Sequence, residues 1–336
     1  MNKRPIIGIT LGDPAGIGPE IVLGSLKSKE VYEKCIPVVI GHASVLRRCS
    51  LATGISAGDI QIINSPKEAK CEYGKVEIVH VETPGMEDIE PGKLSAEAGL
   101  ASNAFIKRAC ELGLAGEIEA ISTTPINKES LRLANVEHIG HTEMLAAYLD
   151  TTNPLTLFIT ENMRIFFLSR HFSLKKAIDY ITEERVYDFA KRVHSAMTDF
   201  GFVNPKIGLA ALNPHASDGG QFGDEEEKFL VPAARHAQAD GINISDPIGA
   251  DSVFNMALEG RFDCVVSLYH DQGHIAAKTR DFYGTVTATL GLPVLRTSVD
   301  HGTALDIAWK GIANPVSMKS AILAAVDMLS QTQKVG

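Results

Sequence analysis

The sequence predicts an α/β protein whose strands pair mainly in parallel. Short apolar runs alternate with segments of helical periodicity along all 336 residues, which is the pattern of successive βαβ units. The length, together with a hydrophobic share of 45%, is enough for a large core and favours more than one domain. We therefore expect two α/β/α domains with mainly parallel sheets.

The first predicted strand, Pro5–Thr10, leads into the turn "LGDPAGIGP", and a helical pattern begins at Glu20. Strand, glycine turn and helix form the context of a dinucleotide-binding fingerprint. However, the glycines read G-x-x-x-G-x-G rather than G-x-G-x-x-G, and no Gly-Lys-Ser/Thr follows. The pattern therefore favours a tight βα turn at the top of a parallel sheet over direct binding of a pyrophosphate.

The remaining strands and helices follow from the same alternation. The further predicted strands are Ile36–Ile40, Ile60–Ile63, Val76–Val81, Ala120–Thr123, Leu157–Thr160, Ile165–Leu168, Ile207–Leu212, Cys264–Leu268 and Val294–Thr297. Helical periodicity is clearest over Ser95–Leu112, Glu183–Phe200, Glu225–Ala239 and Met318–Leu329.

Composition excludes several classes of partner. A net charge of −9 argues against nucleic acid or an anionic membrane as a ligand. No apolar run reaches the ~20 residues of a membrane span, and the first residues lack the apolar core of a signal peptide. Five scattered cysteines without a C-x-x-C pair are typical of reduced packing residues in a cytoplasmic protein.

Four segments place polar residues directly after apolar strands, and each contains a histidine. They are "FFLSRHFS" with His171, "GLAALNPHASDGGQFGDEE" with His215, "CVVSLYHDQGH" with His270 and "LRTSVDHGTALD" with His301. Ligands of α/β sheets bind at the carboxyl ends of the strands, so these histidines are candidates for one site. Three neutral imidazoles with an open position are the arrangement of a catalytic divalent metal, and imidazole suits zinc, cobalt or nickel better than magnesium.

Two cationic residues nearby are candidates for an anionic substrate. Lys278 follows His270 by eight residues, and Arg296 lies within an apolar strand pattern before the "DHGT" turn. Burial of an arginine without an anionic partner is costly, so we expect a ligand or an ion pair at Arg296. His141 opens a predicted helix in "HIGHTEML", and the backbone N–H groups of such a helix start can hold an oxyanion.

Several motifs together resemble the 4-hydroxythreonine-4-phosphate dehydrogenase family. They are "GDPAGIGPE", "TTPINK", "GHTE", "LNPHASDGG", "YHDQGH" and "TLGLPVLRTSVDHGTALDIA", in the family's order along the whole chain. The segment "HGTALDIAWKGIANP" also resembles a loop of isopropylmalate and isocitrate dehydrogenases. The opening turn is similar to the first βα turn of that superfamily, and the resemblance implies its fold, with an active-site cleft between the two domains.

The resemblance also implies roles for particular residues. It implies a homodimer with shared active sites that uses NAD and one divalent ion per site, which is zinc, cobalt, manganese or magnesium. The implied NAD contacts are His301, Gly302, Thr303, Asp306 and Asn314. The implied metal ligands are His171, His215 and His270. The implied substrate contacts are His141, Thr142, Lys278, Thr287 and Arg296, and Asp251 is an aspartate near the metal.

Two residues depart from the family pattern. Thr287 stands where the family usually has asparagine, and Trp309 stands where the superfamily usually has glycine. "NMRIFFLSRHFSLKKA" and "YHDQGHIAAK" look more like the paralogous branch that oxidises 4-phospho-D-threonate or 4-phospho-D-erythronate. We therefore rank that phosphorylated acid first, 4-hydroxy-L-threonine 4-phosphate second, and a cis-dihydrodiol third. A non-catalytic sugar-acid-phosphate binding protein is the alternative from another functional class.

The expected chemistry is oxidation of the C3 hydroxyl by NAD, followed by loss of CO2 from the resulting β-keto acid. Phosphothreonate would then give dihydroxyacetone phosphate. Asp251 and Lys278 are both candidates for the proton transfer. The expected domains are residues 1–125 with 282–336, which carry the cofactor loop, and residues 126–281, which carry the metal and substrate ligands.

Overall fold

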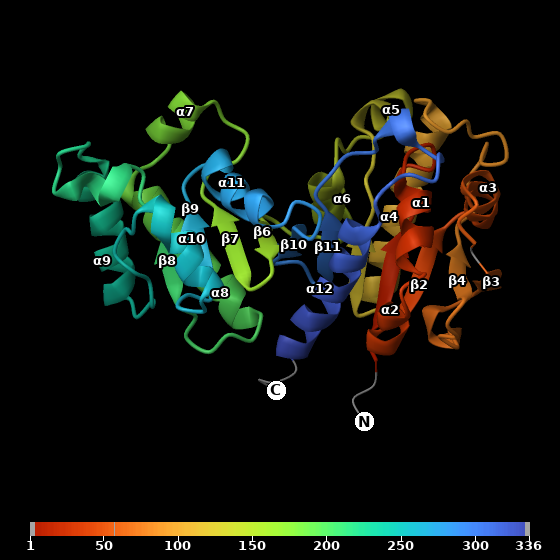
Figure 1. The fold of residues 1–336 in the computed structure, drawn as a ribbon, viewed down its shortest axis with the longest axis horizontal. Helices are drawn as coiled ribbons and strands as arrows, with labels where there is room; N and C mark the ends of the chain where they lie inside the picture. The colour runs from red at the N-terminus through yellow and green to blue at the C-terminus, as the bar shows by residue number, and fades with distance from the viewer. Residues whose placement is uncertain (1–3, 57, 333–336) are drawn as a thin grey trace. The chain divides into compact units, whose positions relative to one another are not determined.

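The computed structural model of the chain describes residues 4–56 and 58–332. These residues form two compact units, each with strands and helices of its own (Figure 1). Unit 1 contains the described residues up to Pro154 together with Gly291–Ser330, and unit 2 contains Leu155–Leu290 with the last described residues, 331–332. Both units are α/β, as the sequence predicts. The strand pairs of unit 1 are parallel, whereas unit 2 combines two parallel with two antiparallel pairs and so departs from the predicted mainly parallel pairing.

The sheet of unit 1 is parallel throughout, in the order β3-β4-β2-β1-β5-β11. Its strands are β1 (Ile6–Thr10), β2 (Ile36–Gly41), β3 (Asp59–Ile63), β4 (Lys75–His80), β5 (Ala120–Thr123) and β11 (Leu295–Val299). Its helices are α1 (Gly18–Ser25), α2 (Lys29–Lys34), α3 (Ala43–Thr53), α4 (Ala96–Leu114), α5 (Lys128–Leu133), α6 (His141–Tyr148) and α12 (Val316–Thr332).

Side chains from both faces of this sheet are buried, which explains its nearly continuous apolar strands. On β2, Val39 packs into a core with α1, α3 and α12, whereas Val38 and Ile40 pack into a second core with α4, α5 and α6. Gly8 of β1 lies against the second core, where a Cβ would come within 2.6 Å of Ile118 Cδ1.

The sheet of unit 2 is mixed, in the order β10-β6-β7-β9-β8. β6 pairs with β10 and β7 in antiparallel fashion, and β7, β9 and β8 are parallel neighbours. Its strands are β6 (Leu155–Thr160), β7 (Met163–Phe167), β8 (Ile207–Leu209), β9 (Cys264–Ser267) and β10 (Val286–Leu290). Its helices are α7 (Leu174–Asp179), α8 (Glu183–Asp199), α9 (Val231–Ala239), α10 (Ala250–Leu258) and α11 (His270–Arg280).

The chain passes from one unit to the other near residues 154/155 and 290/291, whereas the sequence analysis places these passages near 125/126 and 281/282. The difference comes from α5 and α6, because both pack on α4 of unit 1. Among the helices of the described residues, none combines the length and the apolar character needed to cross a membrane.

Candidate functional site

The three candidate metal histidines follow three neighbouring parallel strands of unit 2. His171 follows β7, His270 follows β9 and His215 follows β8, and β9 lies between the other two strands. Parallel strands end at the same edge of a sheet, where α/β proteins bind their ligands. Topology therefore brings the three loops to one edge.

His171 and His270 come close together in the single chain. Their ring centroids are 6.2 Å apart, with an angle of 43° between the ring planes. Two imidazoles that share one ion through bonds of about 2.1 Å have ring centroids roughly 5–6 Å apart. The Nδ1–H of His270 donates to Asp271 Oδ1 at 2.6 Å, which leaves the Nε2 lone pair available. A carboxylate behind a histidine is the usual orienting partner of a metal ligand.

His215 lies beside Asp251, on a separate loop. Gly249 is close to both, because a Cβ at this glycine would lie 2.5 Å from Asp251 Oδ1 and 3.9 Å from His215 Cα. Within the part of the chain that the structure describes, the ligand atoms of His171, His215 and His270 do not all lie within 4.8 Å of one another. The donor chemistry of the three histidines fits a divalent ion, and the geometry of one chain brings together His171 with His270, and His215 with Asp251.

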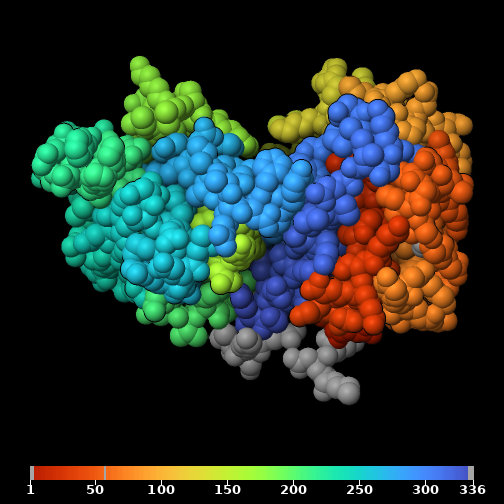
Figure 2. Space-filling model, in the orientation of Figure 1, coloured from red at the N-terminus to blue at the C-terminus, as the bar shows by residue number. Residues whose placement is uncertain are grey.

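Helix α11 presents a row of polar side chains one turn apart. His270 and His274 stack with ring centroids 3.8 Å apart, and the Nδ1–H of His274 donates to the His270 carbonyl at 2.7 Å. Lys278 follows one turn later, with its Nζ 5.1 Å from the ring centroid of Phe282. The space-filling view shows this segment, in light blue, at the surface of unit 2 (Figure 2). The sequence analysis names His270 and Lys278 but not His274, although the four-residue spacing in "HDQGHIAAK" is a readable signal.

Unit 1 contains a buried cationic site around Arg296 of β11. Arg296 is 7% exposed, and its Nε and Nη2 donate to Thr123 Oγ1 at 3.0 and 2.8 Å. Burial lowers the pKa of Arg296 to about 10. His141, at the start of α6, keeps its Nε2 buried without a hydrogen-bond partner among the described residues. Burial, followed by the charge of Arg296, holds the pKa of His141 well below its ordinary value.

The other two predicted substrate contacts lie on different elements. Thr142 follows His141 in the first turn of α6, and Thr287 is a buried residue of β10 in unit 2. A buried guanidinium beside an unpartnered imidazole nitrogen suits an anionic group such as a phosphate or a carboxylate.

The predicted cofactor loop, residues 301–314, packs against the opening glycine turn. The Ile17 N–H donates to the Thr303 carbonyl at 3.0 Å, and a Cβ at Gly16 would lie 3.0 Å from that oxygen. Asn127 Nδ2 donates to Thr303 Oγ1 at 3.2 Å. The turn that resembles a dinucleotide fingerprint therefore supports a neighbouring loop through its backbone.

The candidate cofactor contacts differ in exposure along this loop. His301, Gly302, Asp306 and Asn314 are exposed, and Thr303 is buried. Asn314 Oδ1 accepts the Val316 N–H at 3.0 Å, which fixes the start of α12. Ala304 and Trp309 have left-handed φ values of 40° and 58°, a conformation that non-glycine residues keep only where the surrounding structure enforces it.

Trp309 is the bulky residue that departs from the superfamily pattern. Its side chain is buried beneath the Arg48 guanidinium, which lies 5.5 Å from the ring centroid. Arg48 also donates to the carbonyls of Met86 and Ile89, both at 2.8 Å. The tryptophan and the arginine together tie the cofactor loop to the segment after β4.

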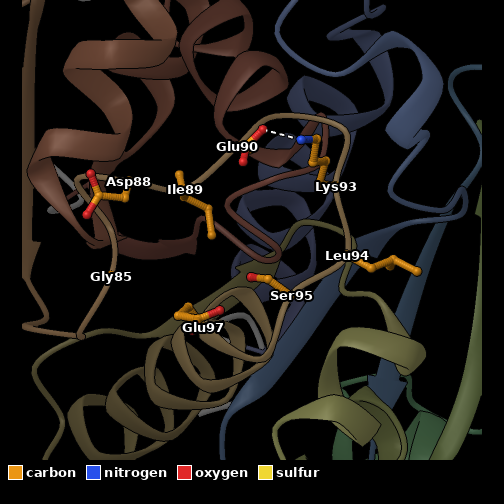
Figure 3. A pocket seen from close by; sticks show the side chains of 8 residues that line it. All are labelled: Gly85, Asp88, Ile89, Glu90, Lys93, Leu94, Ser95 and Glu97. Carbon is orange, nitrogen blue, oxygen red and sulfur yellow. Dashed lines mark ion pairs between the residues drawn. The ribbon is translucent and has the colours of Figure 1, made fainter.

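That segment borders a pocket of about 360 Å³ in unit 1 (Figure 3). The pocket is lined by Gly85, Asp88, Ile89, Glu90, Lys93, Leu94, Ser95 and Glu97. The segment also touches the cofactor loop, because a Cβ at Gly92 would lie 2.8 Å from the Leu305 carbonyl oxygen. No motif in the sequence of this segment indicates a role for it.

A second group of metal-type side chains lies at the ends of β2 and β4. The ligand atoms of His42, His80 and Glu82 all lie within 4.8 Å of one another. However, His80 Nδ1 accepts the Ala43 N–H at 3.2 Å, so the ring proton is on Nε2, which donates to Glu82 Oε2 at 3.0 Å. A metal at Nε2 would require that proton to leave and the Ala43 bond to break. The geometry therefore favours a hydrogen-bonded cluster.

The family profile of Pyridoxal phosphate biosynthetic protein PdxA matches residues 33–325. The chain belongs to the PdxA family. Among PdxA-family relatives, a Clostridium botulinum protein provisionally named D-threonate 4-phosphate dehydrogenase is 50% identical over 334 residues, covering 99% of this chain and 100% of the relative. A Halalkalibacterium halodurans protein with the same provisional name is 49% identical over 324 residues, which cover 96% of this chain and 96% of the relative.

Solved PdxA-family structures have the same fold. The 4-hydroxythreonine-4-phosphate dehydrogenase of Klebsiella pneumoniae superposes with a TM-score of 0.89 at 38% identity, over 96% of this chain and 99% of that one. A terephthalate 1,2-cis-dihydrodiol dehydrogenase from Burkholderia xenovorans gives 0.64 at 27% identity, over 96% and 98%. The predicted family and fold class are confirmed, and the chain is a dehydrogenase by family.

Proposed function

We propose that this chain oxidises the C3 hydroxyl of 4-phospho-D-threonate or 4-phospho-D-erythronate with NAD and then decarboxylates the product. The observation that carries the proposal is the 50% identity, over nearly the whole chain, to a protein provisionally named for D-threonate 4-phosphate. In this proposal phosphothreonate gives dihydroxyacetone phosphate and CO2. The enzyme acts in the cytoplasm as a homodimer whose active sites draw residues from both subunits.

The proposed binding groups fall into two sets. His171, His215 and His270 hold a divalent ion, with His270 oriented by Asp271, and the loop from His301 to Asn314 binds NAD. When bound, the ion supplies Lewis-acid polarisation of the substrate oxygens and the nicotinamide accepts the hydride. Zinc and cobalt suit three imidazoles best, and manganese and magnesium are the weaker alternatives.

The proposed roles of the other residues concern charge and protons. Arg296, His141 and Thr142 bind an anionic end of the substrate, and Thr287 contributes to the substrate pocket. Lys278, two turns after His270 on helix α11, or Asp251, beside His215, accepts the proton of the C3 hydroxyl. Asp306 is exposed on the cofactor loop, where a carboxylate favours a ribose hydroxyl over the 2′-phosphate of NADP.

4-Hydroxy-L-threonine 4-phosphate is the second candidate substrate. It is favoured by the 0.89 TM-score to the Klebsiella pneumoniae enzyme named for that compound, although the identity of 38% is lower than the 50% of the threonate-named relative. The dihydrodiol ranks third, because the corresponding structure is more distant.

A substrate panel tests the proposal. NADH formation is measured for the three phosphorylated acids, for unphosphorylated D-threonate and for a cis-dihydrodiol, each with added Zn²⁺, Co²⁺, Mn²⁺ or Mg²⁺. We expect the highest kcat/KM with phosphothreonate or phosphoerythronate. We expect a loss of two decades or more without the phosphate, since each charge-assisted contact contributes about 1.5–3 kcal/mol.

Two variants locate the phosphate contact. Arg296→Ala should reduce the advantage of the phosphorylated acid, whereas Arg132→Ala, an exposed residue paired with Glu129, should leave it unchanged. Equal turnover of D-threonate and its 4-phosphate would contradict the proposal and favour the dihydrodiol assignment. No NADH from any of these compounds would favour a non-catalytic binding protein.

A further inference from the structure

The turn that carries His215 has an unusual backbone. Four successive non-glycine residues are left-handed, with φ values of 53° at His215, 54° at Ala216, 70° at Ser217 and 45° at Asp218. The left-handed region brings Cβ too close to the following carbonyl oxygen, so only glycine adopts it readily. A run of this length persists only where other groups hold it in place.

Glu226 supplies those groups. Its side chain is 3% exposed, and its Oε1 accepts the backbone N–H groups of Leu212 and Asn213, both at 2.8 Å. Its Oε2 accepts Asn213 Nδ2 at 2.8 Å and the Ser217 hydroxyl. The carboxylate therefore binds the chain on both sides of His215.

The segment that carries Glu226 is itself irregular. Glu226–Leu230 is a single π-helical turn that leads into α9, and such turns are frequent at functional sites because they redirect one side chain. The neighbouring Glu225 bonds the Asn213 amide but not Ser217. Of the carboxylates in this segment, Glu226 is the one that spans the left-handed turn.

We propose that Glu226 is a positioning residue that holds the His215 turn in its left-handed conformation and so presents the His215 ring for metal binding. The proposal rests on the proposed function, in which His215 is a metal ligand. Glutamine at position 226 keeps the shape of the side chain but has one acceptor oxygen instead of two. The His215 turn then loses the hydrogen bonds of one carboxylate oxygen, either those to the residues before His215 or the one to Ser217 after it.

Metal binding to the metal-free full-length chain tests this inference. Co²⁺ and Zn²⁺ titrations are followed by calorimetry and by the cobalt absorption spectrum for the wild type, Glu226→Gln, His171→Ala and the control Glu227→Gln. Glu227 is exposed on the same turn. We expect Glu226→Gln to raise the Kd by ten- to a hundredfold, Glu227→Gln to leave it unchanged, and the KM for NAD to change in neither variant.

A second substitution that relieves the backbone of the turn distinguishes a positioning role of Glu226 from a general effect on stability. Ala216→Gly removes the steric cost of one left-handed residue, so adding it to Glu226→Gln should restore part of the metal affinity. If Glu226→Gln does not fold, Ser217→Ala replaces it, because it removes one anchor and leaves Glu226 charged. A several-fold rise in the Kd is expected for that variant.

The outcomes distinguish the positioning role of Glu226 from the proposed metal site itself. The positioning role is overturned, with the metal site intact, if His171→Ala loses metal binding while Glu226→Gln keeps the wild-type affinity. The same holds for Ser217→Ala where it replaces Glu226→Gln. Affinity lost in Glu226→Gln without any recovery on adding Ala216→Gly would also overturn it. If the wild type and His171→Ala bind metal equally, or neither binds, the proposed metal site fails and this inference fails with it.

Discussion

His141 is a histidine that the fold keeps neutral. Its Nε2 is buried without a hydrogen-bond partner among the described residues, and the Arg296 charge is close enough to disfavour a second cation. A neutral imidazole beside a buried guanidinium leaves one net positive charge to meet an anion. In the proposed function, the pair therefore binds a phosphate without first taking up a proton.

This environment predicts a sensitivity to acid. The folded pKa of His141 lies below its unfolded value of about 6.5, so below that pH the unfolded chain binds a proton that the folded chain does not. The free energy of unfolding should fall by about 1.4 kcal/mol per pH unit until the folded pKa is reached.

Urea unfolding between pH 7.5 and pH 5 measures this slope. His141→Asn should flatten it, and His236→Asn, an exposed histidine stacked on Tyr187, should not. Parallel pH profiles for the wild type and His141→Asn would exclude His141 as the source of the sensitivity.

At the same scale, candidate metal ligands can be recognised in the sequence more readily than the residues that position them. His171, His215 and His270 are recognisable because each follows an apolar strand. Glu226 is one of three consecutive glutamates, and nothing in "DEEEK" indicates which of them turns inward. That choice depends on the π-helical turn and on the donors of the His215 loop, which only the folded chain brings together.

Among the elements, strands were predictable where they are apolar and not where they are polar. β10 escapes the pattern because "VTATL" alternates threonine with apolar residues, yet all five residues are buried. Helix α11 escapes it because its polar sequence has no apolar stripe and no capping side chain at its N-terminus. Both elements carry candidate site residues, Thr287 on β10 and His270 on α11. The two elements that the sequence pattern does not predict are therefore elements of the candidate site.

The packing of α4 on α5 gives a prediction at this scale. A Cβ at Gly99 would lie 2.1 Å from the Ser130 carbonyl oxygen, which is backbone. The three atoms nearest to a Cβ at Gly113 of the same helix, at 2.7–3.3 Å, all belong to the Val294 side chain, which can rearrange. Alanine favours a helix by about 1 kcal/mol over glycine, but at position 99 the two helices must separate.

We therefore expect Gly99→Ala to lower the free energy of unfolding by about 2 kcal/mol or more, measured by urea denaturation. Gly113→Ala serves as the control and should be much closer to the wild type. Equal effects of the two substitutions would show that the contact with Ser130 is not the constraint.

On the scale of the whole molecule, the two proposed ligands depend on different units. The candidate metal histidines belong to unit 2, and the loop from His301 to Asn314 belongs to unit 1. A ligand stabilises the part of the protein that it binds, by about 2.7 kcal/mol at a hundredfold excess over Kd.

Amide hydrogen exchange should therefore show protection by the metal and protection by NAD in different segments of the chain. Zn²⁺ should slow exchange in peptides around residues 163–171, 207–217 and 264–274, and NAD should slow it around residues 8–20 and 301–315. NADP at the same concentration should protect the second set less. Protection of the first set by NAD alone would be inconsistent with this division.

The place where the chain leaves unit 1 and returns to it has a consequence for the history of the gene. Leu155 and Leu290, the two ends of unit 2, are paired with each other in the β6–β10 ladder. On the side of unit 1, the Thr151 hydroxyl donates to the Gly291 carbonyl at 2.9 Å, and a Cβ at Gly291 would lie 3.9 Å from Pro154 Cα. The two ends of each unit thus lie together at the junction, so a single insertion is enough to place the histidine-bearing unit inside the sequence of the other.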